Sequence, residues 1–190
     1  MRQATSGALV KSVSDQLGSA ANHLFRAWSL LPKHEHVPYR QSFDPMTVVR
    51  ILPVITLLQL VGDKEWRFRL AGTEVDRRWG RPLTGVDILD IVAPEVALTI
   101  WREFGEIVRQ PCGSWSVRRV TIASGRWAHI ETLRLPLRAK DGSVSLIIGT
   151  SGELCDRRAH QGDLHRSITT VEQQWFFDIG AGVTTHSVLN

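Results

Sequence analysis

Cysteine is scarce, and long apolar runs are missing. The 190 residues include two cysteines, Cys112 and Cys155, which do not form a CxxC pair. A single possible bridge does not make a disulfide scaffold, so we expect a reducing, cytoplasmic location. No stretch approaches the roughly 18 apolar residues that cross a bilayer, and residues 1–17 lack the apolar core of a signal peptide. The sequence therefore predicts a cytoplasmic protein without a membrane segment.

Charge of one sign is not in large excess either. The 23 lysines and arginines face 19 aspartates and glutamates, a formal net charge of +4, and the arginines are scattered. Nucleic-acid-binding proteins usually carry a clustered basic patch, so nucleic acid is not an expected partner. Hydrophobic residues make up 43% and charged residues 22%, which is ordinary for a globular domain that buries its own core. Tryptophan is abundant, with seven residues, and such rings fill cores or line pockets.

The first periodic segment is a helix over residues 19–31. Leu24, Trp28 and Leu31 recur at spacings of four and three, which places them in one apolar stripe. Residues 1–18 carry little apolar pattern, and we expect them to be flexible.

Strands and helices alternate through the next part of the chain. Asp44 is placed to cap a short helix that begins at Pro45. Thr73 and Asp76 have the spacing of a capping box at the start of another helix. The other expected elements are strands over 54–61 and 66–70 and an amphipathic helix over 94–109.

Three strands follow, over about 114–123, 127–138 and 143–153. Ser124-Gly125 and Asp141-Gly142 are hairpin signals, so these strands form an antiparallel meander. Strands grouped at both ends of a helical middle predict an α+β domain with helices on one face of the sheet. Residues 156–190 form a tail. Its apolar patch, Trp175-Phe176-Phe177, should be covered by the domain, a second copy or a partner.

Several short sequence motifs occur in a particular order along the chain. They are Phe-Asp-Pro at 43–45, Arg-Ile-Leu-Pro at 50–53, Trp-Arg-Phe-Arg-Leu-Ala-Gly-Thr at 66–73, Trp-Gly-Arg-Pro-Leu-Thr-Gly at 79–85, Leu-Arg-Leu-Pro-Leu at 133–137 and Ser-Leu-Ile-Ile-Gly at 145–149. With the order of elements, they resemble the PAS domain superfamily, in particular the PAS_5-like bacterial single-PAS-domain proteins.

The resemblance implies a PAS fold over residues 19–155: a five-stranded antiparallel sheet with helices on one face, a hollow between them, and an added N-terminal helix. It also implies a regulatory or sensory module that binds a small ligand or a regulatory partner protein, without catalysis. PAS domains often dimerise through an N-terminal helix, so a homodimer through the helix at 19–31 is expected.

Alternation along 66–70 suggests where a ligand would lie. Trp66, Phe68 and Leu70 fall on one face of the strand and should meet the helix at 94–109. The ligand-pocket candidates are Trp66, Phe68, Leu70, Trp101, Phe104 and His129. A pocket there would be mainly apolar; the alternative is a filled core without a pocket.

The cofactor is unknown, and two common ones are disfavoured. The helix at 94–109 has no histidine to hold haem, and neither cysteine lies in the Asn-Cys-Arg-type motif of flavin-binding relatives. No histidine cluster has the spacing of a closed metal site, so no metal is expected.

Two other functions remain open. His129 and Glu131 share a strand face and could be the acid/base pair of a small α+β enzyme with its site in the hollow. An outward arginine face, unless a bulge intervenes, could bind an anion or a nucleic acid; it would comprise Arg67, Arg69, Arg134 and Arg138.

Overall fold

A six-stranded antiparallel sheet lies at the centre of the fold. The computed structural model describes residues 13–62, 65–122, 124–154 and 170–183. In these ranges, no helix combines the length and the apolar character needed to cross a membrane. The elements are α2 (Ser19–Ser29), β1 (Lys33–His34), β2 (Val37–Pro38), the 3-10 helices η1 (Arg40–Ser42) and η2 (Pro45–Val54), β3 (Ile55–Val61), β4 (Glu65–Ala71), α3 (Thr73–Trp79), the 3-10 helix η3 (Ile88–Asp90), α4 (Pro94–Arg109), β5 (Cys112–Thr121), β6 (Trp127–Arg138), β7 (Val144–Glu153) and β8 (Thr170–Asp178).

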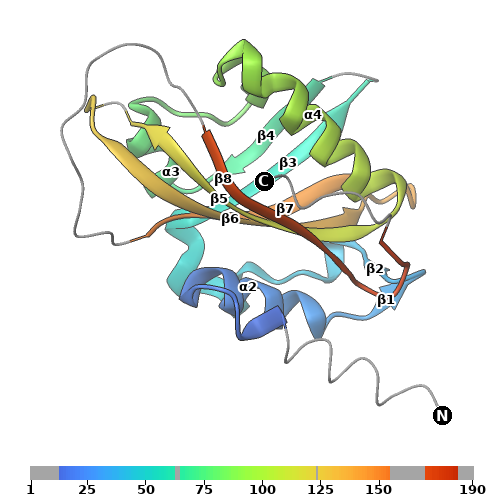
Figure 1. Cartoon of the computed structure of the whole chain (residues 1–190). Coiled ribbons are helices and arrows are strands. Elements are labelled where there is room, and N and C mark those ends of the chain that lie inside the picture. The colour runs from blue at the N-terminus through green and yellow to red at the C-terminus, as the bar shows by residue number, and fades with distance from the viewer. Residues whose placement is uncertain (1–12, 63–64, 123, 155–169, 184–190) are drawn as a thin grey trace.

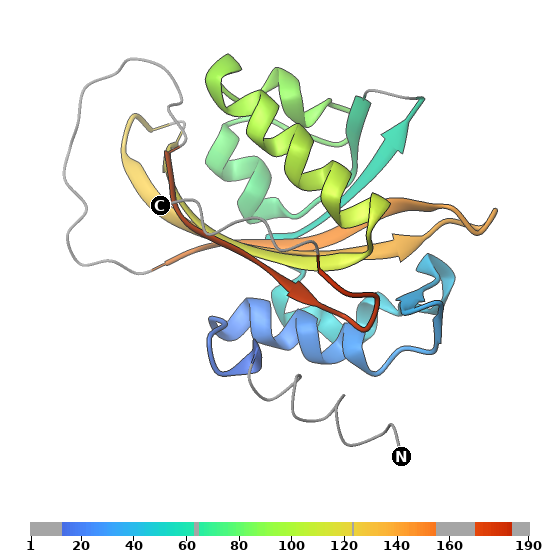
Figure 2. The same ribbon diagram turned by 45° about the vertical axis from the view of Figure 1, so that its right-hand side comes forward.

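The sheet is covered by helices on both faces. Its strand order is β4-β3-β7-β6-β5-β8, and every neighbouring pair is antiparallel. The layer of α3 and α4 covers one face, and the layer of α2 covers the other (Figures 1 and 2). The predicted α+β class is confirmed, but the sheet has six strands rather than five. Both faces are covered because the middle of β6 is buried along consecutive residues, so each face needs an apolar cover.

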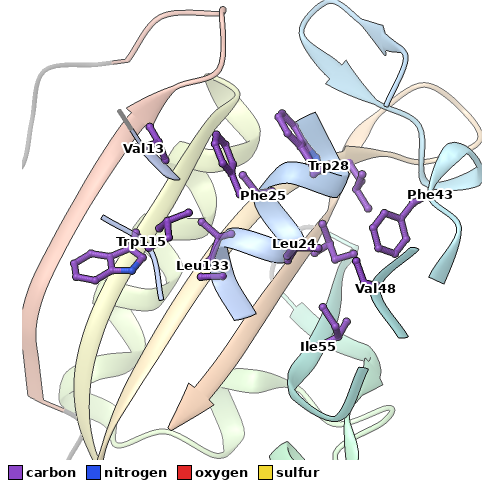
Figure 3. Close-up of a cluster of buried hydrophobic side chains, with 14 of the residues drawn as sticks. Val13, Leu24, Phe25, Trp28, Phe43, Val48, Ile55, Trp115 and Leu133 are labelled. Carbon is purple, nitrogen blue, oxygen red and sulfur yellow. The ribbon is translucent and has the colours of Figure 1, made fainter. Parts of the chain in front are cut away.

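The helix α2 packs its apolar stripe against the sheet. Leu24, Phe25 and Trp28 are buried in a cluster with Phe43, Ile55 and Leu133 (Figure 3). The indole Nε1 of Trp28 donates a hydrogen bond to the carbonyl oxygen of Pro136 at 3.0 Å, which ties the helix to β6. The predicted helix is therefore present, and its stripe is used inside the chain.

The segment before α2 also packs on the domain. Val13 and Leu17 are buried in the same cluster as Leu24. The backbone N–H of Gly18 donates to a carboxylate oxygen of Glu131 on β6 at 2.7 Å. Residues 13–18 of the predicted flexible N-terminus are thus held in place, and residues 1–12 lie outside the described residues.

Of the two predicted helix caps, at Asp44 and at Thr73, the structure contains only the first. Asp44 caps η2 as predicted, because its Oδ1 accepts from the backbone N–H of Met46 at 2.9 Å. The predicted capping box of Thr73 is wrong: the N-cap is Gly72, which has no side chain to cap with. Asp76 instead accepts a hydrogen bond from the N–H of Leu83 at 3.0 Å.

A bulge in β4 changes the face of the sheet on which its later side chains lie. Leu58 pairs with Phe68, whereas the adjacent Leu57 pairs with Leu70, so β4 has one extra residue at this point. Phe68 therefore stays on the α4 side and is 4% exposed, while Leu70 turns to the other face and is 40% exposed. The prediction that Trp66, Phe68 and Leu70 share one face is wrong for Leu70.

The aromatic patch of the tail lies in β8, which pairs with β5 along the edge of the sheet (Figure 2). The Trp175 ring lies 5.6 Å from that of Trp115 and 5.2 Å from that of Phe177, and Phe177 makes an edge contact with Phe25 at 5.6 Å. A side chain at Gly113 would collide with the Phe177 ring. The domain itself therefore covers this patch; tail residues 155–169 and 184–190 lie outside the described residues.

We predict that Phe177→Ala lowers the free energy of unfolding by about 3–5 kcal/mol, because it empties a buried aromatic site between β8, β5 and α2. Chemical denaturation followed by tryptophan fluorescence measures this change. Val61→Ala is the control: Val61 is 42% exposed, and its truncation should change stability by less than about 0.5 kcal/mol. Equal effects of the two substitutions would show that β8 does not stabilise the domain.

Candidate functional site

A small hollow lies between the sheet and the layer of α3, η3 and α4. Its free space is about 80 Å³. Most of its walls are apolar, and its polar lining includes two arginines; the residues that matter here are Phe68, Ile100, Val120, Ile130, Arg118 and Arg134. Pockets for drug-sized ligands usually measure about 300–1,000 Å³, so an occupant of this hollow would be a much smaller molecule.

A buried ionic cluster forms one part of the hollow's surroundings. Glu103 comes from α4, and its carboxylate faces two guanidinium groups from neighbouring strands. Arg118 on β5 donates from Nη2 to Oε2 at 2.6 Å, and Arg134 on β6 donates from Nη1 to Oε1 at 2.6 Å. The hydroxyl of Ser114 donates to the same Oε1 at 2.6 Å. These bonds connect α4 to the middle of the sheet.

Burial and charge act in opposite directions on this cluster. Burial alone raises the pKa of Glu103, but the guanidinium groups of Arg134 and Arg118, with the Ser114 hydroxyl, outweigh it and lower this pKa. Burial lowers the pKa of Arg118, which Glu103 partly opposes. One carboxylate thus serves two buried arginines, so the cluster keeps an excess of one positive charge.

One donor of this cluster is left without a partner. Arg118 is 4% exposed, and its Nε donates to Ser116 at 3.2 Å. Its Nη1 is buried and has no hydrogen-bond partner among the residues that the structure describes. An unpaired charged donor in the interior is costly, so this atom is the strongest local indication of a missing ligand.

A third buried arginine lies at the side of the hollow. Arg78, on α3, donates from Nη1 and Nη2 to the hydroxyl and carbonyl oxygens of Ser151 at 3.0 and 3.1 Å, and Ser151 lines the hollow. Burial lowers the pKa of Arg78, partly opposed by Glu153. This residue adds further positive charge near the same space.

The six predicted pocket residues do not all lie in the hollow. Phe68 lines the hollow. Trp66 and Phe104 are buried beside it with their rings 5.0 Å apart, and Trp101 packs against the same cluster while half-buried. Leu70 lies on the other face, in a groove with Leu57. The sixth candidate, His129, contacts the carboxylate of Glu172 at 3.1 Å.

His129 and Glu131 do not lie in the hollow and have separate partners. Glu131 is buried on the α2 side of the sheet, where its Oε1 accepts from Gly18 and from the indole of Trp115, each at 2.7 Å. Alternation along β6 places His129 on that same side, where its ring lies 5.2 Å from that of Trp127. The expectation that His129 faces the hollow is wrong, because the strand positions opening on the hollow are those of Ile130 and Thr132.

The four arginines of the predicted outward face do not form one surface. Arg134 is buried in the ionic cluster, whereas Arg138 pairs with Glu35 at 2.6 Å on the other face. The pairing of β6 with β7 is irregular between Leu137 and Arg138, where the extra residue lies on β7. Arg69 shares with Arg138 an open groove of about 500 Å³. Arg67 instead pairs with Glu65 at 2.7 Å.

Cys112 has the environment of an unreactive thiol. It is 3% exposed, and burial, with smaller contributions from Glu106 and Glu103, raises its pKa to about 12. It therefore remains protonated at neutral pH.

In the described ranges, no group of three or more His, Cys, Asp or Glu side chains is placed to hold a metal ion.

The ionic cluster escaped the sequence prediction. Its signal was available: Glu103 is a lone charge inside the apolar stripe that contains Ile100, Phe104 and Ile107. A carboxylate in such a stripe must find buried cations, and Arg118 lies on a strand that is otherwise buried.

We predict that Glu103→Gln lowers the free energy of unfolding by about 3–5 kcal/mol, because it leaves two buried guanidinium groups without their carboxylate. The matched control is Glu106→Gln, on the same helix. Its ion pair with Arg109 is exposed on the arginine side, so its loss should cost less than about 1 kcal/mol. Denaturant titration at pH 7 measures both.

The pH dependence of stability provides a second test of the Glu103→Gln substitution. Because the folded-state pKa of Glu103 is lowered, its stabilisation is present above the unfolded value of about 4.3 and is lost as pH falls through the folded value. The stability gap between the original chain and Glu103→Gln should therefore shrink on acidification below about pH 4.3. A gap that stays constant down to acid unfolding would contradict the assignment.

Comparison with known proteins places this geometry in a family. A family model described as a PAS domain, PAS_5, matches residues 18–151. No curated protein matches the chain. Among solved structures, VqmA bound to DPO matches at 17% identity and a TM-score of 0.45, covering 58% of this chain and 56% of that one. The Vibrio cholerae VqmA dimer without target DNA has the same identity, score and coverage of this chain, with 52% of its own length.

An RNA-binding light-oxygen-voltage receptor also matches at 17% identity and a TM-score of 0.45, over 65% of this chain and 36% of that one. The aligned region thus spans between about a third and somewhat over half of these solved chains. The family model, by contrast, covers well over half of the 190 residues. With its antiparallel sheet and the hollow beneath α3 and α4, the chain belongs to the PAS domain family.

Proposed function

We propose that this chain is a regulatory or sensory PAS module that binds a small molecule in the hollow and performs no chemistry of its own. The observation that carries the proposal is the buried Nη1 of Arg118, which lacks a partner among the described residues of a pocket with free space. Families of this kind use a bound ligand, or a bound protein, as the input to regulation.

The position of Arg118 suggests how ligand binding in the hollow would affect the rest of the domain. Arg118 lies on β5, opposite Val171 of β8, and the β5–β8 register shifts between Val117 and Arg118. Through Glu103 the same side chain is joined to α4. A ligand that changes the Arg118 contacts would therefore bias both α4 and the irregular part of the β5–β8 pairing.

Catalysis by the predicted acid/base pair is a weaker alternative. Glu131 uses one carboxylate oxygen to hold Gly18 and Trp115, and His129 lies against Glu172. These contacts are those of groups that hold the backbone and the edge strand in place.

A cytoplasmic location remains part of the proposal and rests on the low cysteine content, with Cys112 a free, buried thiol.

We predict that a screen of small metabolites raises the unfolding temperature for at least one compound. At a concentration about 100 times its Kd, a ligand stabilises by about 2.7 kcal/mol, which corresponds to a rise of about 5–10 °C in a chain of this size. Differential scanning fluorimetry measures the shift, and native mass spectrometry gives the stoichiometry.

Two substitutions of valine by phenylalanine locate the binding. Val92 lines the hollow and is half-buried, so Val92→Phe fills the space, whereas Val61, at the end of β3, lies outside the hollow. The shift should vanish in Val92→Phe and persist in Val61→Phe. A ligand that stabilises both variants equally binds elsewhere and contradicts the proposed site.

The homodimer stays a prediction, and it needs a different surface from the one first expected. Leu24 and Trp28 are buried against the chain's own sheet, whereas Leu30 is 86% exposed at the end of α2. If α2 mediates dimerisation, Leu30→Glu should convert a dimer into a monomer in light-scattering chromatography. Leu98→Glu, at a 55% exposed position on α4, should leave the dimer intact. A monomer in the original chain would refute it.

A further inference from the structure

We infer that the hollow is a site for a short aliphatic monocarboxylate, whose carboxylate is received by Arg118 beside Arg134 while its alkyl part lies against the apolar walls. This inference rests on the proposed ligand-binding function and specifies the chemical class of the ligand.

The charge of the site favours an anion. Arg118 and Arg134 both line the hollow, and they share a single carboxylate, that of Glu103. The cluster thus has an excess positive charge, and Arg78 adds another guanidinium nearby through Ser151. A buried cation without a counter-charge is costly, and an incoming anion would remove that cost.

The geometry of the free donor favours a carboxylate. Arg118 already uses Nη2 for Glu103 and Nε for Ser116, which leaves the Nη1 end of the guanidinium for a ligand. Guanidinium groups form short, charge-assisted hydrogen bonds with carboxylate oxygens. The same side chain shows this pairing with Glu103 at 2.6 Å.

The remaining walls favour a short hydrocarbon part. Phe68, Ile100, Val120 and Ile130 line the hollow, and each is at most 7% exposed. An inorganic anion would leave these walls without a partner, whereas an alkyl chain gains from burial against them. In other proteins a cavity of about 150 Å³ holds benzene. The present 80 Å³ therefore fits a chain of about two to four carbon atoms.

The test is isothermal titration calorimetry of the full chain with three probes: sodium propionate, propionamide and sodium phosphate. Propionamide has nearly the shape of propionate without its charge, and phosphate has charge without an alkyl part. We expect propionate to bind and each of the other two to bind at least about tenfold more weakly.

A pair of arginine substitutions assigns the contact. Arg118→Gln removes the free donor but leaves Glu103 with Arg134 and Ser114, so the cluster becomes electrically neutral and the fold is expected to persist. It should weaken propionate binding at least about tenfold. The matched control is Arg119→Gln on the same strand; Arg119 is exposed and lies over the Trp127 ring, so binding should be unchanged. If Arg118→Gln does not fold, the three-probe comparison on the original chain decides the question.

Each other result has a defined meaning. Propionamide or phosphate binding as tightly as propionate overturns the carboxylate inference. Failure of propionate to bind also overturns it. If a neutral compound from the metabolite screen then binds in the hollow and is lost in Val92→Phe, the proposed function stands without this inference. If no compound of either kind binds, both fail.

Discussion

The carboxylate of Glu103 joins α4 to the centre of the sheet. It is almost completely buried, and its three partners come from two neighbouring strands, β5 and β6. Desolvating such a carboxylate is costly without opposite charges, so α4 can pack here only in a position that brings Glu103 to Arg118 and Arg134. The hollow depends on this constraint, because the two arginines that hold α4 also form part of its lining.

The second constraint is that the sheet must be covered twice. The strand β6 is buried along almost its whole length, and its two faces contribute to different clusters, with Leu133 under α2 and Ile130 toward α3. The segment before α2 is therefore held to Glu131, and β8 brings Phe177 against Phe25. In this PAS domain the N-terminal helix is part of the cover of the sheet, and the tail strand extends the sheet by pairing with β5, the strand that carries Arg118.

Much of the fold could be predicted from local signals, whereas the facing of particular side chains could not. The helix at 94–109 and the strand at 127–138 occur with the predicted bounds, because amphipathic period, proline and hairpin turns act over a few residues. Arg134 is expected on the outward face but pairs with Glu103 on the α4 side. Leu70 faces the wrong way in the prediction because it follows a bulge. One extra residue in a strand reverses every later side chain, and the partner strand that causes it is distant in sequence.

The candidate site shows the same division. By itself, the sequence determined the order of elements, the α+β class and the apolar lining represented by Phe68, since these follow from periodicity and turn signals, and the PAS fold followed from its resemblance to that family. Only the tertiary structure decided that Glu103, Arg118 and Arg134 meet, that His129 and Leu70 lie elsewhere, and that Nη1 of Arg118 has no hydrogen-bond partner among the described residues. The physical reason is that burial and pairing of a charge depend on every element packed around it, whereas a propensity depends only on neighbours along the chain.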